Sequence, residues 1–230
     1  MSKKNLVILS GAGISAESGL KTFRDSDGLW EGFDVMEVAT PRGWRKDPAL
    51  VLDFYNQRRK DVAKANPNEA HKQIASLEEH FNVSIITQNI DDLHERGGST
   101  KILHLHGEIF KMRSSQNEDL VSRIEGDINV GDVAADGAQL RPDIVWFEEP
   151  VPRMELAVPI AMAADIFVVV GTSLVVYPAA SLINYVSLNA PKFIVDKNIP
   201  FIPEMRNLIK IEKPATLGIA ELKEIGRAHV

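Results

Sequence analysis

Four short runs of apolar, mostly β-branched residues constrain the fold of this chain more than any other feature. The runs are nearly continuous rather than alternating, which is typical of strands covered on both faces. Stretches with helical character separate them: one, at 47–65, opens with an Asp N-cap and a first-turn proline, and others are expected over 66–81 and 177–189. Strands that alternate with helices favour an α/β fold with an open, doubly wound parallel sheet. The predicted strands are NLVILS (5–10), VSIITQ (83–88), IFVVVGT (166–172) and KFIVD (192–196).

Two polar stretches interrupt this alternation. Residues 19–50 are rich in Gly, Asp, Trp and Pro, and residues 111–142 are rich in Gly and Asp. A structureless loop of about thirty residues is uncommon inside a compact domain. We therefore interpret each stretch as part of a small insert.

Composition limits the possible functions. The 230 residues carry a net charge of −6, which argues against broad electrostatic binding of nucleic acid. Residues 115–155 hold ten acidic side chains against three arginines, which suits a lysine-rich protein substrate but equally serves solubility. There is no cysteine, and no apolar run is long enough for a signal peptide core or a membrane span. We expect a cytoplasmic protein with no nucleic-acid or membrane partner; the oligomeric state is left open.

A glycine turn follows the first predicted strand. Gly11-x-Gly13-x-x-Ala16 matches the dinucleotide fingerprint, in which glycines permit a tight turn and a close approach to pyrophosphate. Such a turn is also common without any ligand. The acidic residue expected on a second strand about 20 residues later is missing, because LKTFRDSDGLW follows instead. That sequence indicates a loop covering the ligand and disfavours an ordinary dehydrogenase.

Polar residues follow three further predicted strands. Gln88, Asn89 and Asp91 come after the second strand, residues 171–173 after the third, and Asp196 ends the fourth. Asp91 could simply cap a helix. However, carboxyl ends of parallel strands share one edge of the sheet, where ligands bind. Four such clusters together predict a ligand site.

The sequence KILHLHGEIF places His104 and His106 two residues apart, so a strand would direct them to one face. The pair could be metal ligands, a catalytic base with a neighbour, or two core histidines. A metal site needs further ligands, and no second histidine pair with suitable spacing exists. We therefore expect no catalytic metal at this pair.

The combined motifs resemble those of the sirtuins, which are NAD-dependent protein lysine deacylases, and a bacterial-type member in particular. The matching blocks run in the family's order from residue 5 to about residue 217. The resemblance implies a Rossmann-type core (about 1–18, 66–108 and 143–225) with a small domain from two inserts (about 19–65 and 109–142), all within 1–230. The blocks are GAGISAESGLKTFR, TQNIDDLHERGGS, LHGE, RPDIVWFEE, GTSLVVYPAA and FIVD.

The resemblance also implies roles for individual positions. His106 corresponds to the catalytic histidine, which takes a proton from a ribose hydroxyl; an ordinary pKa near 6.5 suits that task. His104 has no counterpart, and we interpret it as structural. Asn89 and Asp91 are implied to assist catalysis, and the products are lysine, nicotinamide and O-acyl-ADP-ribose. The implied NAD-binding residues are Gly11, Ala12, Gly13, Ala16, Phe23, Arg24, Trp30, Gln88, Asn89, Ile90, Asp91, Gly171, Thr172, Ser173, Asp196 and Ala215.

The sequence departs from the family at the structural zinc. Most sirtuins hold zinc on two C-x-x-C pairs, but here Ser114 and Ser115 stand near the first pair and 131–142 near the second. Serine hydroxyls are poor zinc ligands at neutral pH. We therefore expect neither zinc nor another metal. The small domain should be held instead by apolar packing of Leu120, Val121, Ile124, Ile128, Val130 and Val133.

Tyr55 and Arg58 bear on the acyl group. They lie three apart on a predicted helix and so share a face, which for an arbitrary pair would simply be solvated. The spacing is similar to the Y-x-x-R of sirtuins that remove acidic acyl groups, and a guanidinium can bind a carboxylate bidentately. We predict removal of succinyl and malonyl groups, and some deacetylation. The peptide groove is expected near Val145, Trp146, Phe147 and Glu148, where Asp143 and Glu148 depart from common family residues.

Two other functions remain open. A mono-ADP-ribosyltransferase would use the same NAD site but transfer the ribose to a protein side chain. A non-catalytic module that senses NAD or ADP-ribose would not require a base, so His106 argues against it.

Overall fold

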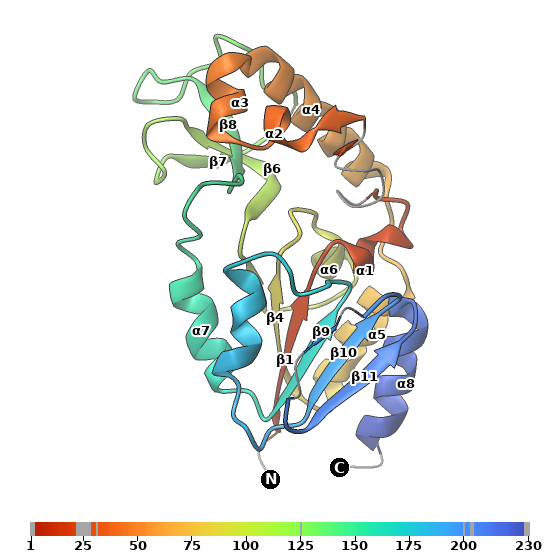
Figure 1. Ribbon diagram of the computed structural model, residues 1–230. Helices are drawn as coiled ribbons and strands as arrows, with labels where there is room; N and C mark the ends of the chain where they lie inside the picture. Colours follow the sequence, from red (N-terminus) through yellow and green to blue (C-terminus); the bar gives the residue numbers. More distant parts are fainter. Residues whose placement is uncertain are drawn as a thin grey trace.

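The structure is a computed structural model that describes residues 3–21, 29–30, 32–124, 126–199, 201–202 and 205–227, with only the backbone at 29–30 and 223–227. Its centre is a six-stranded parallel sheet in the order β11-β10-β9-β1-β4-β5 (Figure 1). The chain leaves β1 toward β4 on one side and returns to β9 on the other, as in doubly wound folds. The strands are β1 (Asn5–Ser10), β4 (Asn82–Thr87), β5 (Ile102–His104), β9 (Ile166–Val170), β10 (Lys192–Asp196) and β11 (Leu208–Glu212).

Helices cover both faces of this sheet. Leu6 and Ile8 of β1 pack toward α5 (Glu69–Ser76), η1 (Leu77–Glu79) and α8 (Ala215–Arg227). The alternate residues, Val7 and Leu9, pack toward α7 (Met154–Met162) and the 3₁₀ helix η2 (Ala179–Tyr185). All four side chains are at most 3% exposed, and burying each contributes roughly 1.5–3 kcal/mol. This double burial explains the continuous apolar runs in the sequence and confirms the predicted fold class.

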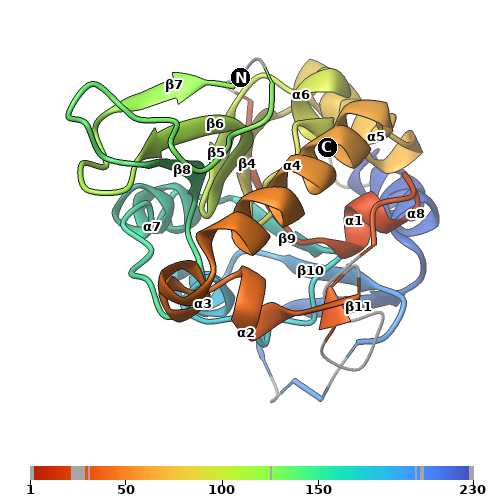
Figure 2. The same ribbon diagram turned by 90° about the horizontal axis from the view of Figure 1, so that it is seen from above.

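A second group of elements lies at the end of the molecule where the strands of the large sheet finish (Figure 1). Three antiparallel strands form the small sheet, in the order β7-β6-β8. Viewed from above, α4 crosses this end of the molecule beside the small sheet (Figure 2). The elements of this group are β2 (Leu29–Trp30), β3 (Phe33–Asp34), α2 (Val35–Val38), α3 (Pro41–Lys46), α4 (Pro48–Lys64), β6 (Gly107–Ser114), β7 (Val121–Arg123) and β8 (Leu140–Ile144). The short helices α1 (Gly13–Ala16) and α6 (Leu93–Arg96) contact α8 and α5 beside the large sheet.

Several predicted boundaries were wrong. The helix expected over 66–81 begins only at Glu69, because the Asn68 side chain accepts a hydrogen bond from the amide of Ala70 and is the N-cap. The helix expected over 177–189 is the shorter η2. The Asp47 cap and Pro48 start of α4 were correct.

The expected apolar packing of the region after β6 was also wrong. Of the six residues proposed for it, only Ile128 is buried, whereas Val121, Val130 and Val133 are exposed. Polar contacts hold this region instead. Asn56 on α4 donates to the carbonyl of Ile128 at 2.9 Å and accepts from its amide at 3.0 Å. Ser114 donates to the Asp136 carboxylate at 2.6 Å and is itself fully buried.

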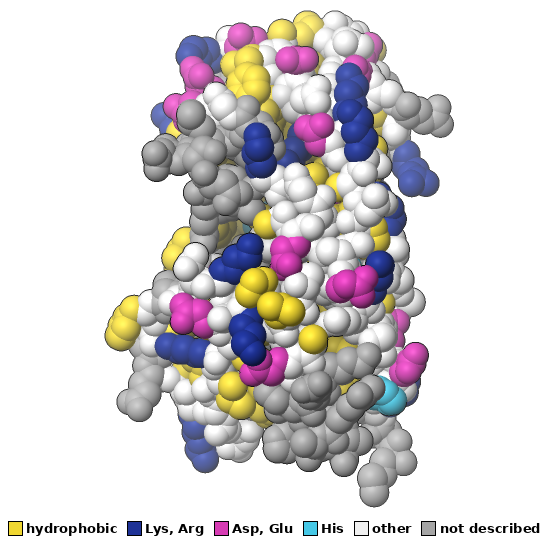
Figure 3. All heavy atoms as spheres, turned by 90° about the vertical axis from the view of Figure 1, so that its right-hand side faces the viewer, with side chains coloured by type: hydrophobic (Ala, Val, Ile, Leu, Met, Phe, Trp, Pro, Cys, Tyr) yellow, Lys and Arg dark blue, Asp and Glu magenta, His cyan; other side chains and the backbone are white. Residues whose placement is uncertain are grey.

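Charges of both signs are interspersed on the face shown in Figure 3.

No helix within the described residues is both long enough and apolar enough to cross a membrane.

Candidate active site

A cleft of about 570 Å³ opens at the carboxyl ends of β1, β4, β9 and β10. Most of the residues predicted for the site line it, although they come from distant parts of the sequence. Parallel strands produce this convergence because all their carboxyl ends lie at one edge. The predicted residues in its wall are Gly11, Ala12, Gly13, Ala16, Tyr55, Gln88, Asn89, Ile90, His106, Val145, Trp146, Phe147, Glu148, Gly171, Thr172, Ser173, Asp196 and Ala215.

Two glycine turns meet at the floor of the cleft. The amide of Gly13 donates to the carbonyl of Gly171 at 2.8 Å, so the turns after β1 and β9 are joined directly. A Cβ on Gly13 would lie 2.8 Å from that carbonyl oxygen, and one on Gly171 would lie 2.2 Å from the amide nitrogen of Ile14. Gly171 also has a φ of +64°. Side chains are therefore excluded here, which leaves the cleft open to a ligand.

Polar groups suited to a nucleotide lie on the β9 and β10 side. The hydroxyl of Ser173 is buried and has no hydrogen-bond partner among the described residues. One carboxylate oxygen of Asp196 accepts from the amide of Asn198 at 3.0 Å. A buried hydroxyl without a partner is costly unless a ligand or water satisfies it, so these residues fit a bound sugar or phosphate.

Asn89 and Asp91 are connected through a residue that the sequence did not single out. The Asn89 amide donates to the Ser15 hydroxyl at 3.1 Å, and Ser15 donates to Asp91 at 3.0 Å. Burial raises the pKa of Asp91, opposed by its hydrogen bonds from Leu93 and Ser15. The only sequence signal for Ser15 was its place within the glycine fingerprint.

His106 lies in the wall of the cleft just after β5. Its Nδ1 is 3.0 Å from the carbonyl oxygen of Gln88, which can only accept. Nδ1 therefore carries the proton in the neutral ring, and Nε2 keeps its lone pair. Burial lowers the pKa of His106, although the bond to Gln88 works in the other direction. The imidazole is neutral at physiological pH and can act as a base at Nε2.

His104 lies behind this site. It is buried, with Nδ1 3.1 Å from the carbonyl oxygen of Asn89 and Nε2 2.8 Å from a carboxylate oxygen of Glu95. These contacts agree with its interpretation as a structural neighbour of His106.

Tyr55 and Arg58 both project from α4 but enter different cavities. Tyr55 is 1% exposed, lines the main cleft and stacks near Trp146, with ring centroids 6.4 Å apart. Burial raises the pKa of Tyr55, so the phenol stays protonated. Arg58 is 7% exposed and, with Asp91, lines an adjoining cavity of about 80 Å³ that shares Asn89 with the cleft. Neither residue belongs to a solvated helix face.

Other predicted residues fall elsewhere. Phe23 and Arg24 lie outside the described residues, as does the side chain of Trp30. Within the described part of the chain, no group of three or more His, Cys, Asp or Glu side chains is arranged to hold a metal ion.

The sheet order, the joined glycine turns and the cleft at the switch point between β1 and β9 define a Rossmann-type nucleotide-binding protein. The family model of the Sir2 family matches residues 11–178. The chain belongs to the Sir2 family.

Individual proteins agree with this membership. The chain is 60% identical over 193 residues to an NAD-dependent protein deacylase of Helicobacter pylori, covering 84% of each chain. It is 50% identical over 228 residues to an NAD-dependent protein deacylase of Bacteroides thetaiotaomicron, covering 96% of this chain and 97% of that one.

Solved structures show the same fold. A mutant Sir2 homologue in complex with ADP-ribose has a TM-score of 0.87 at 36% identity, covering 98% of this chain and 93% of that one. A Sir2 homologue in complex with NAD has a TM-score of 0.85 at 36% identity, covering 98% and 91%. A Sir2 protein bound to acetylated peptide has a TM-score of 0.80 at 28% identity, covering 98% and 94%.

Proposed function

We propose that this protein removes succinyl and malonyl groups, and more slowly acetyl groups, from lysine side chains of proteins. The broader activity is that of an NAD-dependent protein deacylase, as in the relatives with 50–60% identity. NAD is its cofactor. We further propose a cytoplasmic location and a small domain built from about 19–65 and 109–142.

The cleft suits NAD in size and in chemistry. Its volume of about 570 Å³ falls within the usual range for cofactor sites. Gly11 and Gly13 have no side chains, so the pyrophosphate could approach the backbone there, and Ser173 and Asp196 would hold the adenosine half. When bound, NAD supplies the ribosyl carbon to which the acyl oxygen is transferred as nicotinamide leaves.

His106 is the residue proposed to move a proton. Its Nε2 lone pair accepts the proton of a hydroxyl group in the cleft, while Nδ1–H remains bound to the Gln88 carbonyl. The same hydrogen bond fixes the ring plane, so no reorientation is needed during proton transfer. The hydrogen-bond contact between Nδ1 and the Gln88 carbonyl, with His106 in the wall of the cleft, is the observation that best supports catalysis over simple NAD sensing.

The acyl preference rests on Tyr55 and Arg58. A succinyl or malonyl chain ends in a carboxylate, which a guanidinium binds more strongly than it binds a methyl group. Arg58 is buried, already donates to the Lys21 carbonyl at 3.1 Å, and is adjacent to the cavity shared with Asn89. Tyr55 offers a protonated phenol in the neighbouring cleft. An acyl chain whose carboxylate contacts both Tyr55 and Arg58 would lie where the two cavities adjoin.

Replacement of Arg58 tests this preference. Arg58→Met should reduce kcat/KM for succinyl-lysine peptide roughly 100-fold, the value of one buried charge-assisted pair, and reduce acetyl turnover far less. Lys60→Met is the matched control, since Lys60 is on the same helix but pairs with Asp127 at the surface. Equal losses for the two acyl groups in Arg58→Met would refute the assignment.

A further inference from the structure

His104 has hydrogen-bond partners that restrict its ionisation. The Asn89 carbonyl oxygen at 3.1 Å from Nδ1 can only accept a hydrogen bond. The Glu95 carboxylate at 2.8 Å from Nε2 also only accepts when ionised. A neutral imidazole has one N–H and could satisfy only one of them. Both bonds form together only when the ring is an imidazolium.

The charged groups around His104 favour that state. Burial disfavours the imidazolium, but the hydrogen bond and charge of Glu95, followed by the Asn89 carbonyl and Glu108, raise the pKa of His104. Burial alone would raise the pKa of the Glu95 carboxylate. The hydrogen bond and charge of His104 outweigh that effect, so the pKa of Glu95 is lowered. Two other titratable groups face the ring: burial raises the pKa of Asp91 against the opposing charge of His104, and burial lowers the pKa of His94 with a smaller contribution of the same sign from His104.

The two partners of His104 lie on either side of the catalytic segment. Asn89 begins it two residues after the end of β4, and Glu95 lies in α6, so the ring ties together both ends of the stretch that carries Asn89 and Asp91. The histidine itself is anchored by β5, and Arg153 donates to its carbonyl oxygen at 2.8 Å. The ring contacts the backbone of Asn89 and leaves the Asn89 side chain in the cleft.

We propose that His104, as an imidazolium held between Glu95 and the Asn89 carbonyl, is a positioning residue that fixes the Asn89–Asp91 segment for NAD. This inference rests on the proposed function of that segment. Loss of the proton removes one of the two bonds, so the segment is held at one end only. NAD affinity therefore decreases as pH rises through the pKa of His104.

Titration of the protein by NMR together with NAD binding tests this proposal. The histidine Cε1–H resonances and the Kd for NAD are measured on the full chain from about pH 5.5 to about pH 9. We expect His104 to titrate above the ordinary value for histidine, and NAD affinity to fall roughly tenfold along the same curve, as for loss of one hydrogen bond to a charged group. His104→Gln identifies the resonance.

Glu95→Gln is the decisive variant, because it keeps an acceptor oxygen and removes the charge. Both the His104 titration and the NAD curve should move together to lower pH. Glu108→Gln is the graded control: Glu108 is near His104 without bonding to it, so its variant should move both curves less. If His104→Gln does not fold, the resonance displaced in Glu95→Gln identifies His104.

The outcomes separate this proposal from the proposed function. A His104 pKa at or below the ordinary value for histidine would overturn the positioning role. So would a Kd for NAD that does not change over the pH range in which His104 titrates. NAD binding with the expected pH dependence, but without loss of any acyl group from peptides, would support the role of His104 and refute the deacylase proposal.

Discussion

The buried pair His71 and His94 should make the fold sensitive to acid. Their rings pack edge to face with centroids 5.0 Å apart, and both side chains are at most 1% exposed. His94 Nε2 lies 2.9 Å from the Ser10 hydroxyl, which donates to Thr87. Burial, followed by the Arg96 charge, lowers the pKa of His71 to about 4.

The magnitude follows from this shift. In the unfolded chain His71 binds a proton near its ordinary pKa of 6.5, but the native state resists protonation until about pH 4. The contribution to stability is therefore complete above the unfolded pKa of 6.5 and is lost progressively as pH falls from there to the folded pKa of about 4. Proton linkage gives a loss of about 2 kcal/mol between pH 7 and pH 5 from His71. Burial lowers the pKa of His94 as well, so that residue adds a loss of the same sign.

His71→Gln isolates this effect. His71 occupies the third position of α5, where its Nδ1 accepts from the amide of the N-cap, Asn68, at 3.3 Å. Glutamine can make the same capping-box contact but does not titrate. The free energy of unfolding in urea, followed by circular dichroism, should fall about 2 kcal/mol less between pH 7 and pH 5 in this variant than in the wild type.

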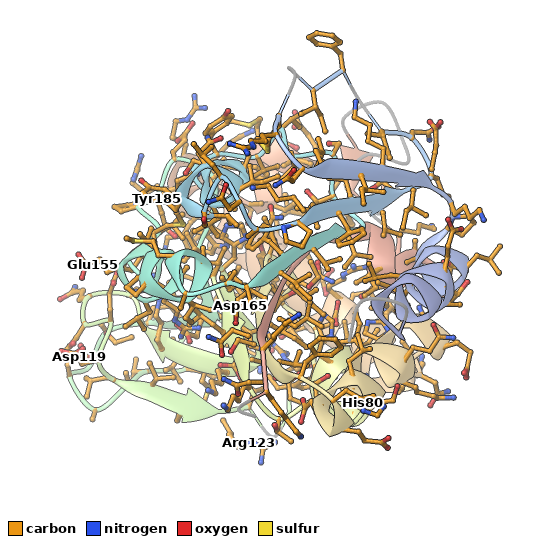
Figure 4. All side chains as sticks on the ribbon, turned by 90° about the horizontal axis from the view of Figure 1, so that it is seen from below. His80, Asp119, Arg123, Glu155, Asp165 and Tyr185 are labelled. Carbon is orange, nitrogen blue, oxygen red and sulfur yellow. The ribbon has the colours of Figure 1, made fainter. Side chains whose placement is uncertain are left out.

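An exposed histidine supplies the control. His80 lies at the margin of the molecule, close to the amino end of β4 (Figure 4). His80→Gln should leave the difference between pH 7 and pH 5 as in the wild type. If His71→Gln also retains the full wild-type difference, the reasoning about the buried neutral ring is wrong.

Three further outcomes are expected. Turnover of acyl-lysine peptides should rise with pH along an acid limb below pH 6.5, because burial lowers the pKa of His106; a limb above 6.5 would contradict its role. Gly107→Ala should lower the free energy of unfolding in urea by more than about 2 kcal/mol, since φ is +84° and the new Cβ would lie 1.9 Å from a carbonyl oxygen. Gly137→Ala is the control: φ is +80° but the space around it is open, so the loss should be about 1 kcal/mol. Ser114→Ala should lower the thermal midpoint by a few degrees and Ser115→Ala should not; equal effects would exclude the Ser114 contact as the cause.

The central strands could be predicted because burial on two faces leaves a clear mark on the sequence. The outer strands leave a weaker one. β5 has only three residues. β11, at the opposite edge of the sheet, leaves the side chain of Ile209 exposed to solvent. Neither run is continuous and apolar, so neither was predicted. Pairing with β4 and β10 defines them instead.

Strand ends alone predict the location of the ligand site but not the contacts between its residues. Strand ends identify the edge of the sheet, but the contact between Asn89, Ser15 and Asp91 depends on how two loops fold against each other. The same holds for His104 and His106. Their spacing suggested one shared face, whereas each binds the carbonyl of a different residue after β4 and only His106 enters the cleft.

The region after β6 shows why hydrophobic composition misled. Its valines suggested a small core, yet the segment is too short to bury them. It is held through its backbone by side chains of α4, including Asn56 and Arg59, which donates to the carbonyl of Gly126 at 3.2 Å. Contacts with backbone atoms leave little trace in the identity of the residues contacted.

The most direct measurement uses matched succinyl-, malonyl- and acetyl-lysine peptides with NAD, following peptide mass and nicotinamide release. We predict that the acidic acyl groups are lost faster than acetyl, that one nicotinamide is released per acyl group, and that no peptide gains mass. Gain of an ADP-ribose on the peptide would indicate a transferase instead. Retention of every acyl group, with NAD bound but nicotinamide not released, would contradict the proposed catalysis.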